Sequence, residues 1–457
     1  ISSPAELMNV FNNAVGNVVT ADLKLVADLD FSSSGLNLPL GAHTEGSCIE
    51  FSGSMNGNGH SIRHLVMDNK DKAGYSHGGL FCMLNDVTIE NLVIESTCSF
   101  AGITTGSVTV NATGSVSMKN VINKAAVTGT QKVGGFIGNI FEVKNKDVQL
   151  TFTECVNKGT ISSSGYTGGF VGDINQNKNV TMKTIDSSNE GNIIGNGKYV
   201  GGFVGFIFFN TEITLITSNS INKGDLNGNN CGGFFGGMMN NKVIVKIFDS
   251  VNQGIVTANK RFAGGFIGLF DNNNDQSGIL ISNGTNNGNV IGSETDAAGF
   301  VGHMWFSSRS YHITLVIGNS ANKGRIQSDT GIACGMACID LEHNEGIDIS
   351  VINSINKGRI NGKTYAFGII NIIKTAENVV GMGEVIGHTD SFTFWNTSRE
   401  IPNTVEDFYG LETNCQNCHK ALQFRHNDIT DLYESVRSGN AIHCLLNEKV
   451  LKEKGTI

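Results

Sequence analysis

Short stretches in which apolar and polar residues alternate recur along most of this chain. "EITLITS" at 212–218 and "IDISVIN" at 347–353 are two of them. Alternation with a period of two residues places every second side chain on one face, which is typical of a half-buried β-strand. Between residue 30 and about residue 390 the 3.6-residue period of a helix is absent. The pattern therefore predicts an all-β body.

The alternating stretches belong to a repeat whose most regular member is an asparagine. Its copies are 30 to 36 residues apart. An aliphatic residue follows four positions after each copy, and a glycine follows two positions after all but the first, where Ala125 stands. A short polar or acidic residue lies three positions before it. The asparagines are Asn123, Asn157, Asn189, Asn222, Asn252, Asn286, Asn322 and Asn356.

A second regular position lies near the middle of each unit, where a large apolar residue usually follows two glycines. These residues are Phe136, Phe170, Phe203, Phe234, Phe266, Phe300, Met336 and Phe367. We predict three short strands per unit: one around the aliphatic residue, one through the Gly-Gly-Phe-x-Gly motif and one in the alternating stretch. A variable loop rich in Asn and Lys separates the last two.

A three-strand unit of about 33 residues cannot bury its own apolar face, but stacked copies can. The repeat therefore predicts a parallel β-helix, or β-solenoid, in which identical positions lie about 4.8 Å apart. The asparagines would form a hydrogen-bonded ladder, and the aromatic residues would stack in the core. We expect the glycine after each asparagine to adopt a positive φ at a corner. A β-propeller is the alternative, but its blades usually have four strands in about forty or more residues.

The two ends of the chain differ from the repeat. Residues 4–15 predict a short amphipathic helix with Ser3 as N-cap and Pro4 at its first position, which would cover the open first rung. We expect this helical cap and the first strand in residues 1–30, and the solenoid repeats in 31–390, with the clearest copies in 118–375. Residues 391–457 predict an α-containing C-terminal cap or a small cysteine-containing domain, with helix-like sequence at 427–454.

Several motifs resemble GLUG-type repeats. "HGGLFCMLNDVTIENLVIE" at 77–95 and the Gly-Gly-Phe-x-Gly series carry the resemblance. The segment at 6–67, with "DLD" at 28–30 and "GNGH" at 57–60, is similar to the one that often precedes such repeats. The resemblance covers about residues 1–390 and departs from the family in using Phe for Leu in later copies. It implies a secreted or cell-surface β-solenoid, adhesin-like or protease-associated in many members, with no catalytic residue in the repeat itself.

Composition narrows the classes of partner. Only 16% of residues are charged and the net charge is −9, so no basic footprint for nucleic acid or an anionic membrane is expected. No apolar run approaches the roughly 20 residues of a membrane span. Because the sequence starts at Ile1, removal of a signal peptide is one expectation. The family resemblance leads us to expect an extracellular or cell-surface protein. Candidate glycosylation acceptors are Asn111, Asn179, Asn283 and Asn396.

The ten cysteines allow several chemistries. Cys155 and Cys231 lie in repeat strands and are expected to be small buried residues. If Cys334 and Cys338 share one extended strand, they are about 13 Å apart and cannot form a disulfide with each other. "CQNCH" at 415–419 has the spelling of a c-type haem attachment site, without a haem-pocket pattern. We expect no cofactor, with a disulfide or unligated cysteines there; the alternative is a structural zinc held by Cys415, Cys418, Cys444 and His443.

Candidate catalytic groups are few. The column before the asparagines contains the acids Glu154, Asp186 and Asp249, and His60 lies in the "GNGH" turn. A carbohydrate-active β-helix enzyme needs clustered carboxylates, and these acids alternate with asparagines. We therefore predict a non-enzymatic β-solenoid for adhesion or structural assembly, which contacts a protein or glycan through its variable loops. The alternatives are a carbohydrate-active β-helix enzyme and a structural subunit of a larger filament.

Overall fold

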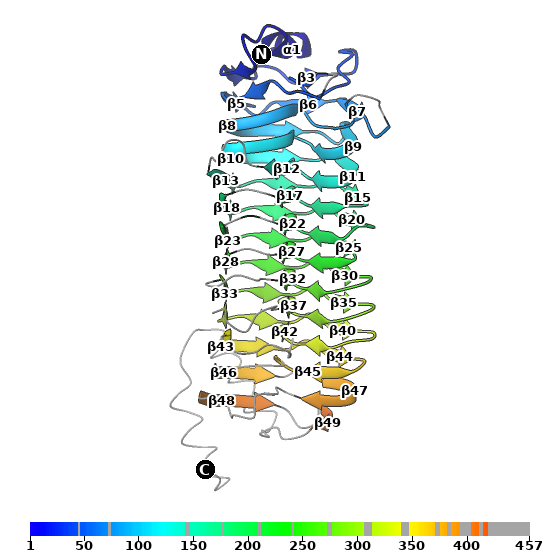
Figure 1. Cartoon of the computed structure of the whole chain (residues 1–457), viewed down its shortest axis with the longest axis vertical. Helices are drawn as coiled ribbons and strands as arrows, with labels where there is room; N and C mark the ends of the chain where they lie inside the picture. The colour runs from blue at the N-terminus through cyan, green and yellow to red at the C-terminus, as the bar shows by residue number, and fades with distance from the viewer. Residues whose placement is uncertain are drawn as a thin grey trace.

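The chain forms a long β-solenoid in a computed structural model (Figure 1). The structure describes residues 1–43, 46–71, 75–141, 147–175, 178–208, 210, 212–239, 242–271, 277–305, 313–339, 347–370, 375–381, 385–392, 404–410 and 415–418. Rungs of about 33 residues pair in parallel and in register, so that Asn157, Asn189 and Asn222 lie opposite one another in successive strands. The predicted all-β parallel solenoid is confirmed.

Each regular rung has five short strands, because the predicted segments are subdivided. Two columns of strands form one sheet, which we call sheet C. The first column contains β15 (Ile161–Ser163), β20 (Ile193–Gly195), β25 (Leu226–Gly228), β30 (Val256–Ala258), β35 (Val290–Gly292), β40 (Ile326–Ser328) and β44 (Ile360–Gly362). The second contains β16 (Tyr166–Gly168), β21 (Tyr199–Gly201), β26 (Asn230–Gly232), β31 (Ala263–Gly264), β36 (Ala297–Ala298), β41 (Ala333–Cys334) and β45 (Tyr365–Phe367).

The other three columns belong to the larger sheet A. The first contains β12 (Ile137–Phe141), β17 (Val171–Asn175), β22 (Val204–Phe208), β27 (Phe235–Met239), β32 (Ile267–Asp271), β37 (Val301–Trp305) and β42 (Ala337–Ile339). The second contains β13 (Val148–Thr153), β18 (Asn179–Ile185), β23 (Glu212–Ser218), β28 (Lys242–Phe248), β33 (Ser277–Ser282), β38 (Ile313–Gly318) and β43 (Ile347–Asn356). The third contains β14 (Val156–Asn157), β19 (Ser188–Asn189), β24 (Ile221–Asn222), β29 (Val251–Asn252), β34 (Thr285–Asn286) and β39 (Ala321–Asn322).

The solenoid continues toward both ends. Its N-terminal strands are β1 (Val18–Val19), β2 (Asp22–Lys24), β3 (Leu29–Asp30), β4 (Glu50–Phe51), β5 (Ser54–Asn56), β6 (Ser61–Arg63), β7 (Val66–Asp68), β8 (Phe81–Ile94), β9 (Ser99–Gly106), β10 (Thr109–Asn123) and β11 (Ala126–Gly134). Its C-terminal strands are β46 (Thr375–Gly381), β47 (Val385–Phe392), β48 (Thr404–Gly410) and β49 (Cys415–Cys418). Parallel pairing thus extends past residue 390, where the repeats were expected to end.

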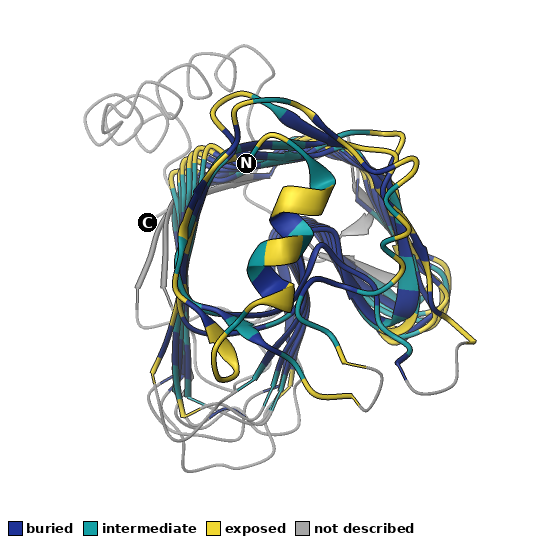
Figure 2. Cartoon of the chain, turned by 90° about the horizontal axis from the view of Figure 1, so that it is seen from above, coloured by how far each residue is buried: buried dark blue, intermediate teal, exposed yellow. Residues whose placement is uncertain are grey.

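The helix α1 (Pro4–Asn12) lies across the first rungs when the solenoid is seen from above (Figure 2). Ser3 is its N-cap and accepts a hydrogen bond from the backbone of Glu6, as the sequence predicts. The ring of Phe11 packs 5.8 Å from Phe51 and 5.7 Å from Phe81. The helix therefore covers the open end of the core. The expected C-terminal helical region, 427–454, lies outside the described residues.

The eight repeat asparagines form one buried column along the core. The Nδ2 of each donates to the Oδ1 of the next, at 2.7 to 2.8 Å over seven successive bonds. Each Nδ2 also donates to the carbonyl two residues further along its own chain, as Asn222 does to Gly224. All eight side chains are fully buried. The ladder therefore satisfies polar groups that no water reaches.

The positive φ expected at the glycine after each asparagine is found elsewhere. It occurs three residues before the asparagine, at φ of +47° to +56°, in Asn120, Glu154, Asp186, Asn219, Asp249, Asn283, Asn319 and Asn353. Asn and Asp tolerate this conformation better than other side chains do. The glycine is required for space instead, since a Cβ at Gly224 would collide with the carbonyl of Gly191 and lie 2.9 Å from Asn189 Nδ2.

The expected strand through Gly-Gly-Phe-x-Gly is a corner between the two sheets. β21 ends at Gly201 and β22 begins at Val204, so that the chain turns through Gly202 and Phe203. A Cβ at Gly202 would collide with the carbonyl of Gly233 and lie 2.8 Å from Asn222 Oδ1. The paired glycines therefore recur because the corner passes directly against the asparagine ladder.

The large residue at this corner enters the core. Successive rings from Phe136 to Phe300 have centroids 4.6 to 4.9 Å apart. Met336 continues the column, but Phe367 does not. The backbone N–H of Met336 donates to Ile369, and Phe367 lies opposite Cys334. The next core residue is thus Ile369, because in this rung phenylalanine takes the place of the first glycine and packs outside the corner.

The same corner corrects one expectation about the cysteines. Cys334 and Cys338 form a disulfide, with Cα atoms 5.6 Å apart, because β41 ends at Cys334 and β42 begins at Ala337 on the other side of the bend. A second disulfide joins Cys48 and Cys82 on neighbouring rungs. Cys155 and Cys231 are free and buried.

Candidate functional site

Two columns of side chains follow the outside of the Gly-Gly corner along the solenoid. They come from the two sheets and contact each other across the corner, as Tyr199 and Phe206 do. The wall on sheet C contains Lys132, Tyr166, Tyr199, Asn230, Phe262 and Asp296, which lie in register on successive rungs. The wall on sheet A contains Asn139, Asp173, Phe206, Gly237, Leu269 and His303. We call these two columns the corner groove.

The middle of the corner groove is aromatic. The rings of Tyr199 and Phe206 are stacked with centroids 4.1 Å apart and planes at 11°. Tyr166 lies 4.7 Å from Phe206, and Phe208 lies 5.2 Å from it on the other side. Tyr199 and Phe206 are buried, whereas Tyr166 and Phe208 are partly exposed. The buried rings therefore hold the exposed ones in fixed positions.

Tyr199 is held by its hydroxyl and along one edge of its ring. Its hydroxyl donates to the thioether sulfur of Met239 at 3.3 Å. Its ring lies against Gly237, where a side chain would collide with it. Burial raises the pKa of Tyr199 to about 12, so the hydroxyl stays a neutral hydrogen-bond donor at physiological pH.

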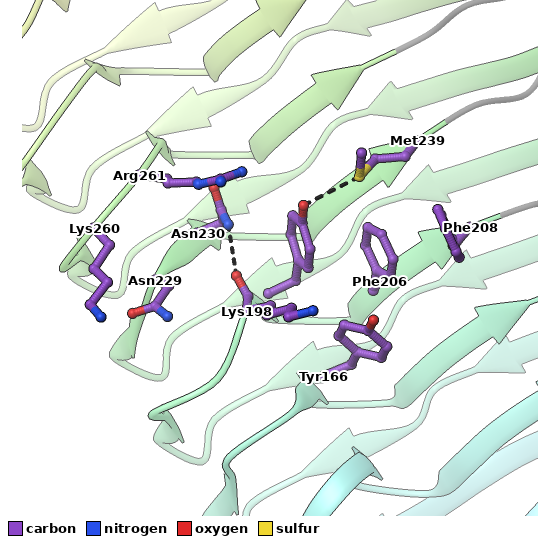
Figure 3. Close-up of a pocket in the computed structure, with 10 residues that line it drawn as sticks. Tyr166, Lys198, Phe206, Phe208, Asn229, Asn230, Met239, Lys260 and Arg261 are labelled. Carbon is purple, nitrogen blue, oxygen red and sulfur yellow. Dashed lines mark hydrogen bonds between the residues drawn. The ribbon is translucent and has the colours of Figure 1, made fainter.

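A pocket of about 430 Å³ opens over this aromatic segment. Its apolar side is lined by Tyr166, Tyr199, Phe206, Phe208 and Met239, and its polar side by Lys198, Asn229, Asn230, Lys260 and Arg261. Figure 3 shows Lys260 and Arg261 to one side of the aromatic rings, while the Lys198 side chain extends beneath the rings toward Tyr166. An apolar surface with a few convergent polar groups is the usual composition of a ligand site.

The polar side of the pocket comes from the turns between β20 and β21, β25 and β26, and β30 and β31, and from Asn230 at the start of β26. Asn230 connects these turns. Its Nδ2 donates to the Lys198 carbonyl at 2.7 Å, and its Oδ1 accepts from the backbone N–H of Phe262 at 3.4 Å. The backbone N–H of Arg261 also donates to the Asn229 carbonyl at 2.8 Å. The backbones that carry the cations are therefore fixed, although their side chains are exposed.

Toward the N-terminus the corner groove becomes a polar cluster. Lys132 Nζ lies 2.9 Å from Asp173 Oδ2 and donates to Asn139 Oδ1 at 3.1 Å. Asp173 is fully buried, and burial raises its pKa, although the Lys132 ammonium acts in the opposite direction. Asn139 in turn donates to Asn111 at 3.4 Å. At this end the polar side chains of the two columns contact one another.

Toward the C-terminus the corner groove contains a histidine paired with an acid. His303 Nδ1 lies 2.9 Å from Asp296 Oδ2, and its ring stacks on Phe262 with centroids 4.0 Å apart. Burial raises the pKa of the nearby Asp271, although the charge of His303 acts in the opposite direction. Beyond this cluster lies the Cys334–Cys338 disulfide. The groove thus changes from aromatic and basic to acidic within a few rungs.

The residues singled out from sequence lie mostly in the frame of the fold. The ladder and the aromatic stack are buried inside. Among the acids before the asparagines, Asp186 and Asp249 accept hydrogen bonds from Asn219 and Asn283 of the next rung, at 2.5 and 2.6 Å. His60 lies 3.5 Å from Asp28. The structure does not bring these groups together at one site.

The candidate glycosylation acceptors are held by hydrogen bonds where they are described. Asn179 donates to Asp147 at 2.8 Å, Asn283 donates to Asp249, and Asn111 lies in the polar cluster of the groove. Asn396 lies outside the described residues. The Nδ2 atoms of Asn179 and Asn283 are therefore engaged, whereas Asn111 takes part through its Oδ1.

The candidate zinc ligands are only partly placed. Cys415 and Cys418 lie at the ends of β49, where only the backbone is described, and His443 and Cys444 lie outside the described residues. No group of three or more His, Cys, Asp or Glu side chains suited to a metal occurs in the described part of the chain. Nor does that part contain a helix long and apolar enough to cross a membrane.

The corner groove could not be predicted from the sequence because its residues change along the solenoid. Tyr166 and Tyr199 share one position before the glycine motif, but the next rung carries Asn230 there, and the position of Phe206 after the motif also varies. The usable signal was the clustering of Tyr and Phe on both sides of this motif in adjacent copies, with Lys198, Lys260 and Arg261 just before it.

Comparison with known proteins gives limited resemblances. No family model matches the chain. A segment of 146 residues, 30% of this chain, is 29% identical to halomucin from Haloquadratum walsbyi (strain DSM 16790 / HBSQ001), and the match spans 2% of the length of halomucin. The crystal structure of a candidate immunoglobulin A1 protease from Bacteroides ovatus is 12% identical, with 96% of this chain and 87% of that chain covered, at a TM-score of 0.26. This TM-score is too low for any property of that protein to be carried over.

Proposed function

We propose that this chain is a non-enzymatic β-solenoid of the extracellular space or cell surface, which binds a glycan in the corner groove and serves adhesion or structural assembly. The observation that carries the proposal is the pocket over Tyr166, Tyr199, Phe206 and Phe208. Rigid aromatic faces beside hydrogen-bonding amides suit a sugar ring, which has apolar C–H faces and polar edges. The variable loops expected to make contacts lie largely outside the described residues.

Two further observations support the location. The Cys48–Cys82 and Cys334–Cys338 disulfides are typical of an oxidising compartment. The similarity to halomucin supports the same location. Membership of the GLUG-type repeat proteins belongs to this proposal as well, on the motifs at 77–95 and the Gly-Gly-Phe-x-Gly series.

A glycan array with the purified chain tests the proposal. We expect binding to a subset of glycans without any change in their length. Tyr166→Ala and Phe208→Ala should each weaken that binding about tenfold, a factor that corresponds to about 1.4 kcal/mol. Ile194→Ala is the matched control, because Ile194 is 48% exposed and does not line the pocket. If the aromatic variants bind as the parent chain does, the groove is not the site.

One observation favours the alternative, a carbohydrate-active enzyme. Asp296, paired with His303, lies in the same groove as the aromatic pocket, and Asp271, with its raised pKa, lies within electrostatic range of His303. A carboxyl with a raised pKa is suited to general acid catalysis. The alternative predicts that bound oligosaccharides are cleaved and that Asp271→Asn abolishes cleavage. Binding without new reducing ends would exclude it for the glycans tested.

The other alternative, a structural subunit of a larger filament, is tested by assembly. Copurification with a filament in fixed stoichiometry, unaffected by Tyr166→Ala, would favour it over glycan binding.

A further inference from the structure

Three cations gather at the pocket of a chain that is acidic as a whole. The net charge is −9, yet the ten residues that line the pocket include Lys198, Lys260 and Arg261 and no acid. In the described part of the chain, none of these three side chains has an ion-pair partner. Unpaired cations of this kind on one rim of a pocket indicate that an anionic group of a ligand complements them.

We infer that the pocket binds an acidic saccharide, whose carboxylate or sulfate group lies between the Lys198, Lys260 and Arg261 side chains while its ring packs on the aromatic side. This inference rests on the proposed glycan-binding function and specifies the class of ligand. Arginine offers a planar fork that fits a carboxylate or sulfate with two hydrogen bonds, and lysine adds a mobile point charge.

The spacing of the cations fits a group held from two sides. Lys198 and the Lys260–Arg261 pair come from turns two rungs apart, which corresponds to about 9.6 Å along the solenoid. Asn229 lies on the turn between them and supplies an amide donor and acceptor. Because Asn230 bonds to the turns on both sides, the gap between the cations is set by the backbone.

The charge pattern argues against a nucleic acid in this groove. A single-stranded nucleic acid needs a basic track along several nucleotides, with stacking platforms beside it. Here the turns that follow carry Glu294, Asp296 and Asp329 instead. The basic segment is therefore long enough for one or two acidic sugars but not for a polyphosphate chain.

Matched acidic and neutral oligosaccharides test the inference. The probes are a galacturonate hexasaccharide, its fully methyl-esterified form, and a carrageenan-derived hexasaccharide, which carries sulfate and no carboxylate. We expect at least one acidic probe to bind about tenfold or more tightly than the neutral one, with affinity that falls as salt is raised. Preference for one acidic probe identifies the anion as carboxylate or sulfate.

Charge variants connect the preference to the site. Lys198→Ala and Arg261→Ala should each reduce binding of the acidic probe about tenfold, and the preference for the acidic probe over its methyl-esterified form should fall by the same factor. Lys246→Ala is the control, since it removes the same charge from an exposed position on β28. These surface changes are not expected to affect folding, which the thermal melting curve checks.

Three outcomes would overturn the inference. Equal affinity for acidic and neutral probes would leave glycan binding intact but remove the anionic class. Tighter binding of an oligothymidylate than of any saccharide would replace the ligand class. Absence of binding to every saccharide would overturn the proposed function together with this inference.

Discussion

The ring of Tyr199 lies directly against Gly237, one rung further along the corner groove. A Cβ at Gly237 would lie 2.6 Å from Tyr199 Cε1 and closer still to Cδ1. The neighbouring rungs carry Phe206 and Leu269 in this column, so the glycine is a local exception that makes room for the tyrosine. The aromatic pocket therefore depends on a residue that has no side chain.

Gly237→Ala should displace Tyr199 without breaking the solenoid. We expect a loss of about 1–3 kcal/mol in the free energy of unfolding, as for overpacking of a core, and loss of glycan binding. Chemical unfolding and the glycan array measure the two effects. Gly278→Ala is the control, because the nearest atom to its added Cβ is 3.4 Å away. Unchanged binding by Gly237→Ala would show that the position of Tyr199 is not important.

Asn222→Ala should destabilise the protein more than Asn356→Ala. The first removes the acceptor of Asn189 and leaves Asn252 Oδ1 and the Gly224 carbonyl without their donor. Each buried polar group left unpaired costs about 1–3 kcal/mol. Asn356 is the last member of the ladder, so among the described residues Asn356→Ala removes the partners of Asn322 Nδ2 and the Gly358 carbonyl alone. Equal unfolding free energies for the two variants would argue against a continuous ladder.

Asp173 should make stability depend on pH in a defined direction. Its folded-state pKa is raised, so the folded chain binds the proton more tightly than the unfolded chain does. Stability contributed by protonation is thus present below the unfolded-state pKa, near 3.8, and is lost as pH rises through the folded-state pKa. Melting temperatures of the parent chain relative to Asp173→Asn should therefore rise as pH falls toward 4. Parallel pH profiles would contradict this.

Lys132→Met is the complementary variant for the same carboxyl. The Lys132 ammonium is the cation that lowers the pKa of Asp173, so its removal should raise that pKa further. The gain in stability on acidification should then begin at a higher pH than in the parent chain.

The two disulfides should differ in their effect on stability. The bonded cysteines are 34 residues apart in Cys48–Cys82 and 4 residues apart in Cys334–Cys338. Loop-closure entropy assigns about 4 kcal/mol to the longer loop and about 2 kcal/mol to the shorter one. Paired Cys→Ala variants, compared by chemical unfolding, measure both. A count of three free thiols in residues 1–390 after denaturation without reductant checks that both bonds form.

The frame of the fold could be predicted because it repeats, and the site could not because it does not. Asn157 and Phe170 recur with their neighbours in the same order, and parallel stacking explains both columns. The sequence predicts the positive φ at Gly159, because glycine is the usual residue for that conformation, but the structure has it at Glu154. The glycine is needed for its close approach to the asparagine ladder, and this steric requirement cannot be recognised in the sequence. The predictions for Phe367 and Cys334 are wrong for a related reason. Both residues stand just before the bend at the glycines, and the bend places their side chains on the outside of the corner.

The asparagine ladder also gives the rod an electrical direction. Every side-chain amide points its Nδ2 toward the C-terminal end and its Oδ1 toward the N-terminal end. Peptide dipoles in a sheet largely cancel, but these side-chain dipoles add head to tail, with the positive pole near Asn356. A rung moved to another position must therefore keep its amide pointing in the same direction as its neighbours. Two such rods that join end to end bring opposite poles together only when both run in the same direction.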